Sequence, residues 1–227
     1  MKKKVLVYNI MEFPEKIRIF REGIEREVNE AGIDARFVLP EEPTLPLLRE
    51  ECTHLIISGS EASAKDESPW TEELAGLIRY FLDNDKKILA ICYGHQFLAR
   101  VLAGKECVYK LPVPEYGYSR VYLKENPLFA GIMEPVVVQL HYDAVRNLPA
   151  RFEIIADNEI SLQAYQYDGR DVYGVQFHPE FNREAAEYFL DETRKSDPDF
   201  SDFYRNELSD RRQLDQNGLF IRNFLKM

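Results

Sequence analysis

Two alternating patterns of apolar residues run through the first part of the chain. Short apolar runs of the kind found in buried strands occupy residues 3–9, 34–40, 53–60 and 86–92. Between and after them, apolar residues recur at helical spacing, and helices are expected at residues 17–30, 44–51, 68–85 and 95–104. Strands that alternate with helices over short connections are typical of a parallel sheet covered by helices on both faces. The chain is therefore expected to be an α/β protein with a mostly parallel central sheet.

The pattern changes from about residue 105, where short runs rich in β-branched and aromatic residues are separated by turn residues. Strands are expected at residues 106–111, 118–124, 135–142, 152–158, 160–167 and 171–180. We expect them to pair antiparallel, either extending the main sheet or forming a small second sheet within the same domain.

The chain returns to a helical pattern at residues 182–192, and a polar stretch follows. Residues 1–192 are expected to form one domain, and residues 193–227 a polar C-terminal extension that ends in a short amphipathic helix. That extension has three interpretations: it docks a partner, it packs back over the site, or it is solvated. For its middle portion the composition favours solvation.

Charge and composition narrow the classes of partner and location. Of the 227 residues, 30% are charged and the net charge is −10, so the surface is expected to repel nucleic acid and anionic lipid. No apolar stretch reaches the roughly 20 residues needed to cross a bilayer. The basic start MKKK is followed by only about five apolar positions, too few for a secretory signal. A cytoplasmic location is therefore expected, with neither a membrane nor a nucleic acid as partner.

The cysteines Cys52, Cys92 and Cys107 are too few and too irregularly spaced for a disulfide framework or a structural zinc site. They are expected to be free thiols, and no metal or cofactor is expected. Cys92 differs from the other two because it ends an apolar run and begins a helix in the stretch ILAICYGHQFLA, residues 88–99.

The placement of Cys92 matches the strand–turn–helix elbow that presents a nucleophile. Small residues, Ala90 and Gly94, stand two positions to either side and let strand and helix approach closely. The helix N-terminus favours a thiolate over a thiol. A buried core cysteine fits the pattern equally well, so the elbow alone leaves both interpretations open.

A thiolate nucleophile requires a general base, and the chain has four histidines to provide one. His54 begins a strand and His95 adjoins the elbow, so structural roles are expected for both. His178 ends an apolar strand and precedes a proline, which favours an extended backbone that points His178 and Glu180 to the same side. In that position Glu180 can orient the His178 ring. By itself the sequence HPE is more typical of a turn with a structural histidine, but together with Cys92 it favours a base.

Acyl transfer also needs backbone N–H groups that stabilise an oxyanion. The N–H of Tyr93, directly after the cysteine, is one candidate donor, and the loop SGSEAS at residues 58–63 can supply another from Ser60 or Gly59. Such loops are common at strand ends, so the sequence SGSEAS alone is weak evidence for an oxyanion site. Its position after the strand next to that of Cys92 is what favours this role.

The motifs SGSEAS, ICYGHQ, HYD and HPE, in this order and spacing, resemble those of the class I glutamine amidotransferase domain. The EYG at residues 115–117 and the stretch 141–159 are most similar to its GMP synthase branch. The resemblance covers residues 3–192 and implies a flavodoxin-like fold with an antiparallel extension. It also implies that Cys92 attacks the side-chain amide of glutamine to give a γ-glutamyl thioester and ammonia. His178 would then act as base and acid, and Glu180 would orient it.

The resemblance also suggests supporting residues. Gln96 matches the family position that helps to hold glutamine, and Gly59 is expected to line the same substrate site. An oxyanion donor falls at Ser60, where many relatives have glycine. His141 and Asp143 lie near the active site in the resembling branch, and three roles are open for them: direct participation, structure, or sensing of a partner.

The acceptor of the ammonia is not evident from the sequence. No phosphate-cradling S-G-G-x-D or G-x-x-x-x-G-K-[ST] stretch follows the domain, so the resemblance implies a separate synthetase subunit that receives the ammonia. The substrate is expected to be glutamine or another γ-glutamyl compound, since a stand-alone γ-glutamyl peptide hydrolase would use the same residues. A catalytically silent regulatory module would also fit the fold. So would a thiol-redox or chaperone-like protein, which would use Cys92 without His178 and Glu180.

Overall fold

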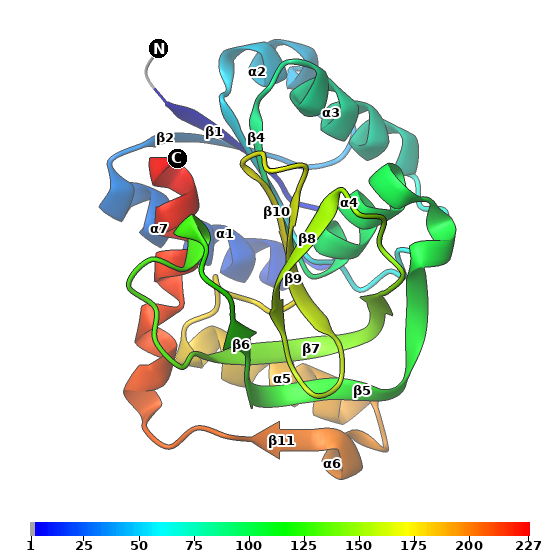
Figure 1. Ribbon diagram of the computed structural model, residues 1–227, viewed down its shortest axis with the longest axis vertical. Helices are drawn as coiled ribbons and strands as arrows, with labels where there is room; N and C mark the ends of the chain where they lie inside the picture. Colours follow the sequence, from blue (N-terminus) through cyan, green and yellow to red (C-terminus); the bar gives the residue numbers. More distant parts are fainter. Residues whose placement is uncertain (1–2) are drawn as a thin grey trace.

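The computed structural model describes residues 3–227 as a large sheet with helices on both sides (Figure 1). The eight-stranded sheet has the order β2-β1-β3-β4-β10-β9-β8-β6, and a three-stranded sheet has the order β11-β5-β7. Within the described residues, no helix is long and apolar enough to cross a membrane.

The first half of the chain has the predicted alternation of strands and helices. The strands are β1 (Lys4–Tyr8), β2 (Asp34–Val38), β3 (His54–Ile57) and β4 (Lys87–Ile91). The helices are α1 (Pro14–Ala31), α2 (Leu45–Glu51), α3 (Thr71–Asp83) and α4 (Tyr93–Ala103). All four strands pair in parallel, which confirms the predicted fold class.

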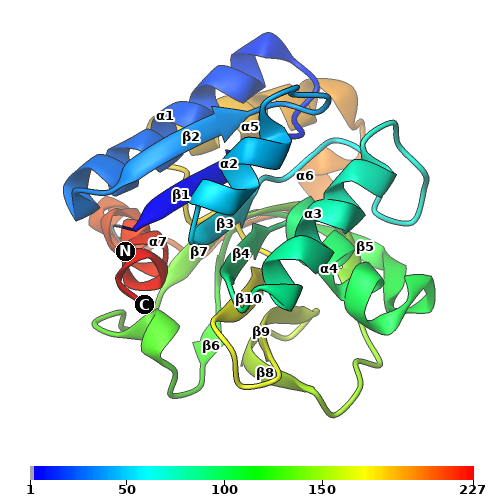
Figure 2. The same cartoon turned by 90° about the horizontal axis from the view of Figure 1, so that it is seen from above.

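Alternate side chains of β1 belong to opposite faces of the sheet. Val5 and Val7 share a core with α1, α5 (Arg183–Ser196) and α7 (Gly218–Lys226). Leu6 and Tyr8 share a core with α2, α3 and α4 on the other face (Figure 2). Because successive side chains of a strand point to opposite faces, a continuous apolar run is what a sheet buried on both faces requires.

The second half of the chain builds both of the arrangements that the sequence left open. Its strands are β5 (Val108–Arg120), β6 (Tyr122–Leu123), β7 (Val136–Val145), β8 (Phe152–Asp157), β9 (Leu162–Tyr167), β10 (Val172–Val175) and β11 (Tyr204–Asn206). Short helices between them are η1 (Lys105–Cys107), η2 (Pro127–Phe129), α6 (Phe200–Phe203) and η3 (Arg211–Gln216). The strands β6, β8, β9 and β10 extend the main sheet, and β5, β7 and β11 form the second one.

The strands of the second half pair antiparallel, as predicted, with two exceptions. β10 pairs in parallel with β4, and β11 pairs in parallel with β5. β10 lies parallel to β4 and antiparallel to β9. Because the carboxyl ends of parallel strands meet at the same edge of a sheet, the segment after β10 lies beside the segment after β4.

The polar segment after α5 is attached to the second sheet, although most of its polar side chains are exposed. β11 pairs in parallel with β5. Phe200 of α6 is 1% exposed and stacks on Tyr116 of β5, with ring centroids 5.3 Å apart. A few apolar side chains within the polar sequence thus hold the segment on the second sheet, and its charged side chains stay at the surface. The domain boundary expected at residue 192 stays a prediction.

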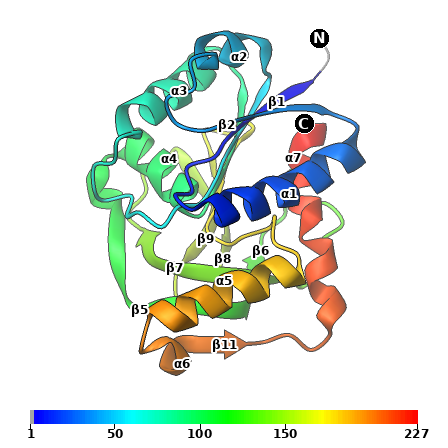
Figure 3. The same ribbon diagram turned by 180° about the vertical axis from the view of Figure 1, so that it is seen from behind.

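The short helix expected at the end of the chain is α7, which lies beside α1 (Figure 3). Its Phe220 and Phe224 are fully buried. Arg222 of α7 forms an ion pair with the buried Glu27 of α1, with Nη1 and Oε2 3.0 Å apart. The C-terminal helix is therefore part of the core that supports α1.

Candidate active site

The turn between β4 and α4 has the backbone strain of an elbow. Cys92 adopts φ 51° and ψ −105°, and a positive φ is uncommon for a residue with a side chain. Its backbone N–H donates to the oxygen of Val175 in β10 over 2.8 Å. Gly94 is required for the close turn, because a Cβ there would lie 2.9 Å from the Ile57 side chain of β3. The turn presents Cys92 at the N-terminus of α4.

His178 and Glu180 follow β10 and form a buried pair, in line with their spacing. Nδ1 of His178 and Oε1 of Glu180 are 2.8 Å apart, and the two residues are 4% and 0% exposed. Burial alone would lower the pKa of His178, but the Glu180 carboxylate and the nearby Cys92 sulfur raise it to about 10. The ring therefore holds a second proton at neutral pH.

An aromatic ring and two residues of α1 support this pair. The His178 ring stacks on Phe181, with 4.5 Å between centroids. Nη2 of Arg26 donates to the backbone oxygen of Glu180 over 3.0 Å. Gly23 lets the same carbonyl approach α1, because a Cβ there would lie 2.5 Å from the Glu180 oxygen. Sequence reasoning missed Gly23 and Arg26, although a glycine in the middle of an amphipathic helix is itself a signal of close packing.

The loop after β3 packs against both the cysteine and the histidine. A Cβ at Gly59 would lie 3.1 Å from Cε1 of His178 and 3.5 Å from Cβ of Cys92. Ser60 and Tyr93 line one hollow together with Cys92. Tyr93 is the first residue of α4, where N–H groups have no acceptor within the helix. The structure thus brings the two candidate oxyanion donors to the cysteine, and their role stays a prediction.

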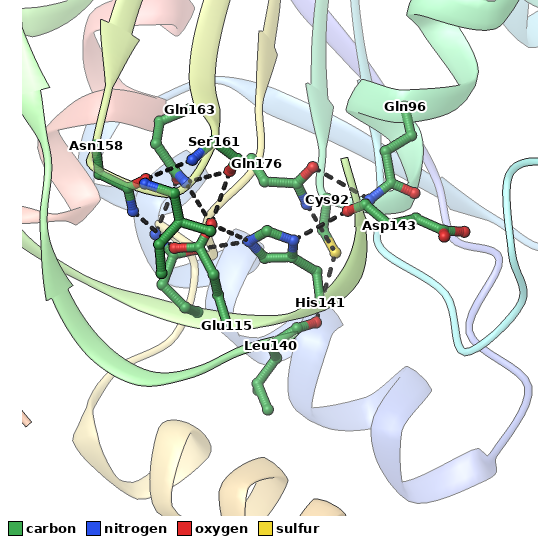
Figure 4. A network of polar contacts seen from close by, with 12 residues as sticks. Cys92, Gln96, Glu115, Leu140, His141, Asp143, Asn158, Ser161, Gln163 and Gln176 are labelled. Carbon is green, nitrogen blue, oxygen red and sulfur yellow. Dashed lines mark hydrogen bonds and ion pairs between the residues drawn. The ribbon is translucent and has the colours of Figure 1, made fainter. Parts of the chain in front are cut away.

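A buried polar network joins the predicted accessory residues to Cys92 (Figure 4). Nε2 of Gln96 donates to the backbone oxygen of Asp143 over 2.7 Å and to Oε1 of Gln176 over 3.1 Å. Nε2 of Gln176 in turn lies 3.7 Å from the Cys92 sulfur. Nδ1 of His141 lies 3.0 Å from the same Asp143 oxygen. Because the Gln96 nitrogen is occupied, the oxygen of its amide is the atom suited to contact a ligand.

Glu115 is a residue of this network that sequence reasoning missed. It is 2% exposed, and its Oε1 lies 3.4 Å from Nε2 of His141. Burial would raise the pKa of Glu115, but His141 and hydrogen bonds from Ser161 and Asn158 lower it below its ordinary value. Each of these two hydrogen bonds is 2.7 Å long. Glu115 begins the EYG stretch, yet the local pattern gives no sign that it faces a histidine of another strand.

Cys92 lies between two hollows of different size. The larger has a volume of about 240 Å³ and is lined by both Cys92 and His178. The smaller has a volume of about 20 Å³ and is lined by Cys92 together with Tyr93, Gln96 and Asp143. The sulfur is therefore accessible to a ligand, although the residue as a whole is only 5% exposed.

The remaining cysteines and two of the histidines are buried in ways that suit structural roles. Cys52 and Cys107 are free thiols, as predicted, and burial raises the pKa of each to about 11. Burial lowers the pKa of His54 to about 4 and that of His95 to about 3, so both rings are neutral. In the part of the chain that the structure describes, no cluster of three or more His, Cys, Asp or Glu side chains could hold a metal ion.

Comparison with known proteins gives this geometry a context. Residues 17–193 match the family described as glutamine amidotransferase class-I. A GMP synthase (glutamine-hydrolyzing) of Bacteroides fragilis is 38% identical over 130 residues, which are 56% of this chain and 24% of that protein. A protein of the same description from Thermosipho africanus is 31% identical over 213 residues, 87% of this chain and 39% of that protein. The chain thus spans well under half the length of these two relatives.

Two further matches cover most of both chains. A protein of Sulfurisphaera tokodaii, described as one subunit of a GMP synthase (glutamine-hydrolyzing), is 32% identical over 160 residues, 69% of this chain and 81% of that protein. The crystal structure of a glutamine amidotransferase from Thermotoga maritima has a TM-score of 0.77 at 24% identity and covers 100% of this chain and 97% of that chain. The second match shows that the fold is shared.

Proposed function

Because this chain belongs to the class-I glutamine amidotransferase family, we propose that it hydrolyses the side-chain amide of glutamine, with the Cys92 sulfur as nucleophile. The observation that carries the proposal is a cysteine on a strained elbow, in a cavity that it shares with a histidine paired to a glutamate. Strain of this kind is typical of functional sites, and a cysteine that only fills a core does not need it.

In the first half-reaction the sulfur attacks the amide carbon of glutamine. The charged His178 ring beside the sulfur favours the thiolate, and it then gives its proton to the nitrogen, which leaves as ammonia. The oxyanion that forms on the carbonyl oxygen is stabilised by the N–H groups of Ser60 and Tyr93. Since Glu180 occupies Nδ1 of the ring, Nε2 is the nitrogen left for proton transfer.

In the second half-reaction water replaces the sulfur. The neutral His178 takes a proton from the water as it attacks the thioester, which releases glutamate and restores Cys92. We assign Gln96 and Gly59 to glutamine binding. Gln96 lines the small hollow beside the sulfur, and Gly59 leaves room next to the histidine.

The test is to incubate the protein with glutamine and to measure glutamate and ammonia. Cys92→Ala should lower the rate by a factor of about 10⁴ or more. Cys107→Ala is the matched control, because Cys107 is a buried thiol of another core, and it should keep the rate. A glutamine-like electrophile should label Cys92 before Cys52. Equal rates for wild type and Cys92→Ala, or equal labelling of all thiols, would contradict the proposal.

We further propose that the ammonia passes to a separate synthetase chain. The support is the similarity to the Sulfurisphaera tokodaii protein, whose name makes it one subunit of a GMP synthase. The expected result is that a GMP synthase synthetase subunit, mixed with this protein, forms its product with glutamine as the nitrogen source. Product that forms with an ammonium salt but never with glutamine would rule out this transfer.

A further inference from the structure

Gln176 is a fully buried residue beside Cys92 that the proposed catalytic steps do not use. It directly follows β10, and its backbone N–H donates to the oxygen of Gln163 in β9 over 2.8 Å. The amide nitrogen of its side chain lies 3.7 Å from the Cys92 sulfur, and the amide oxygen lies 3.1 Å from Nε2 of Gln96 (Figure 4). The side chain thus joins the proposed nucleophile to a residue that we assign to glutamine binding.

The direction of the Gln176 amide is fixed by a backbone carbonyl. A backbone oxygen only accepts hydrogen bonds, so the atom of Gln96 that lies 2.7 Å from the Asp143 oxygen must be its amide nitrogen. The same nitrogen lies 3.1 Å from Gln176, whose facing atom must therefore be an acceptor, the amide oxygen. The nitrogen of the Gln176 amide is then the atom that faces the Cys92 sulfur.

The Cys92 sulfur has one partner for each of its protonation states. The backbone oxygen of Leu140, 3.9 Å away, can only accept a hydrogen bond, so it suits the protonated thiol. The Gln176 nitrogen can only donate, so it suits the thiolate. Hydrogen bonds to an ionised group are about twice as strong as those between neutral groups. The contact with Gln176 therefore favours the charged form of the sulfur.

We propose that Gln176 is a further catalytic residue, which donates a hydrogen bond to the Cys92 thiolate and holds Gln96 with its carbonyl oxygen free for glutamine. His178 favours the thiolate through its charge, whereas Gln176 does so as a neutral dipole. In the second half-reaction the bond between the sulfur and the thioester carbon breaks, and its electron pair stays on the sulfur, where the same N–H stabilises it. The inference rests on the proposed function, but the contact with the sulfur can be tested without glutamine.

The donor role is tested by the pH profile of Cys92 alkylation with iodoacetamide, followed by mass spectrometry of the peptide that contains Cys92. Only the thiolate reacts, so the midpoint of the profile reports how strongly the surroundings favour the thiolate. Gln176→Met keeps the length of the side chain and removes both of its polar atoms. It should raise the midpoint by about one pH unit, the tenfold effect of one hydrogen bond to a charged group.

Titratable groups of the elements around Cys92 also affect this midpoint, and they are the same in wild type and variants. They belong to α1, the loop after β3, β7 and the segment after β10: Lys16, Glu61, His141, Tyr142, Asp143 and His178. The difference between two profiles therefore reports the effect of the substituted side chain.

Gln163→Met is the matched control, because Gln163 is also a fully buried glutamine of this network. Its Oε1 accepts a hydrogen bond from Gln139 over 2.8 Å, and its Nε2 donates to Oγ of Ser161 over 3.0 Å. Both variants bury a methionine in place of a paired amide, but Gln163→Met leaves the contact between Gln176 and the sulfur in place. It should keep the wild-type midpoint.

Gln176→Glu separates the two roles. Its carboxylate still accepts the hydrogen bond from Gln96, but it turns an oxygen and not an N–H to the sulfur. The negative charge also disfavours a neighbouring thiolate, so the midpoint should rise at least as far as in Gln176→Met. The KM for glutamine should stay near the wild-type value. In Gln176→Met, which also releases Gln96, KM should rise about fivefold, the effect of one neutral hydrogen bond.

Three results would overturn the inference and leave the proposed function standing: an unchanged midpoint in Gln176→Met, an equal rise in Gln163→Met, or a KM that rises equally in Gln176→Glu and Gln176→Met. Labelling of the buried Cys52 and Cys107 would reveal a variant that does not fold. If Gln176→Met does not fold, the midpoint of Gln176→Glu decides the donor role. A wild-type protein that releases no glutamate would instead contradict the proposed function, and the alkylation midpoints would still decide whether Gln176 acts on the sulfur.

Discussion

Replacement of Gly23 by alanine tests whether α1 positions the proposed catalytic pair. A Cβ at Gly23 would lie 2.5 Å from the carbonyl oxygen of Glu180, where ordinary contacts begin at 3.4 Å. The carbonyl or the helix must therefore move by about 0.9 Å, the difference between these two distances. Glu180 and His178 are joined over 2.8 Å, so a shift of this size weakens or breaks their contact.

Two opposing terms decide the stability of the Gly23→Ala protein. Alanine inside a helix is favoured over glycine by about 1 kcal/mol. Overpacking costs about 1–3 kcal/mol. A Cβ at Gly76 of α3 would meet nothing within 4 Å, so Gly76→Ala should raise the free energy of unfolding through helix propensity alone. The difference in unfolding free energy between the two variants, about 1–3 kcal/mol, therefore isolates the contact with Glu180.

Urea unfolding measures the two stabilities, and glutamine hydrolysis measures kcat. Misplacement of a catalytic group by about 1 Å costs about 100-fold in rate, so Gly23→Ala should lose about that much of kcat. Gly76→Ala should keep the wild-type rate. If Gly23→Ala were as stable as Gly76→Ala and as active as the wild type, α1 would have no positioning role.

Three further predictions concern the site and the second sheet beside it. The pKa of His178 is raised to about 10 from its ordinary 6.5, so the stability that it contributes is fully present below pH 6.5 and is lost as the pH rises through 10. The difference in unfolding free energy between wild type and Glu180→Gln, measured in urea, should shrink over that range, and a constant difference would refute the assignment. Gly117 has φ 108°, and a Cβ there would lie 2.0 Å from the backbone oxygen of Arg205 in β11. Gly117→Ala should therefore detach β11 and lower the free energy of unfolding by about 2 kcal/mol. Faster hydrogen exchange in β11 would reveal the detachment, and unchanged exchange would argue against it. Glu115→Gln removes the carboxylate that accepts hydrogen bonds from Ser161 and Asn158, and it should lower the free energy of unfolding in urea by about 1–3 kcal/mol; an unchanged midpoint would show that these contacts contribute little.

The elbow and the histidine–glutamate pair could be predicted because their signals are local. Small residues two positions before and after Cys92 define the turn, and an extended backbone before a proline points His178 and Glu180 to one side. Each signal spans only a few positions, where the stereochemistry of strand and turn restricts the geometry. The parallel strands of the first half could be predicted for the same reason, since their order of elements repeats.

Glu115 could not be predicted because its partner is set by register. It lies opposite His141 only because β5 and β7 pair with these two residues in line, beside an irregularity in β5. Side chains of a strand alternate with a period of two, so a shift by one residue would turn Glu115 to the other face. The sequence of neither strand specifies that register, and Gly23 depends in the same way on how α1 packs against the segment after β10.

The C-terminal segment extends this reasoning to the large hollow. Its polar composition predicted solvation, but a composition is an average that does not show which single side chains are buried, and one buried aromatic side chain contributes about 2 kcal/mol. Phe200 packs on Tyr116, and Asp197, three residues earlier, is thereby held within hydrogen-bonding distance of the Tyr116 hydroxyl. The segment whose packing the composition concealed therefore supplies a charged side chain to the wall of the hollow beside Cys92.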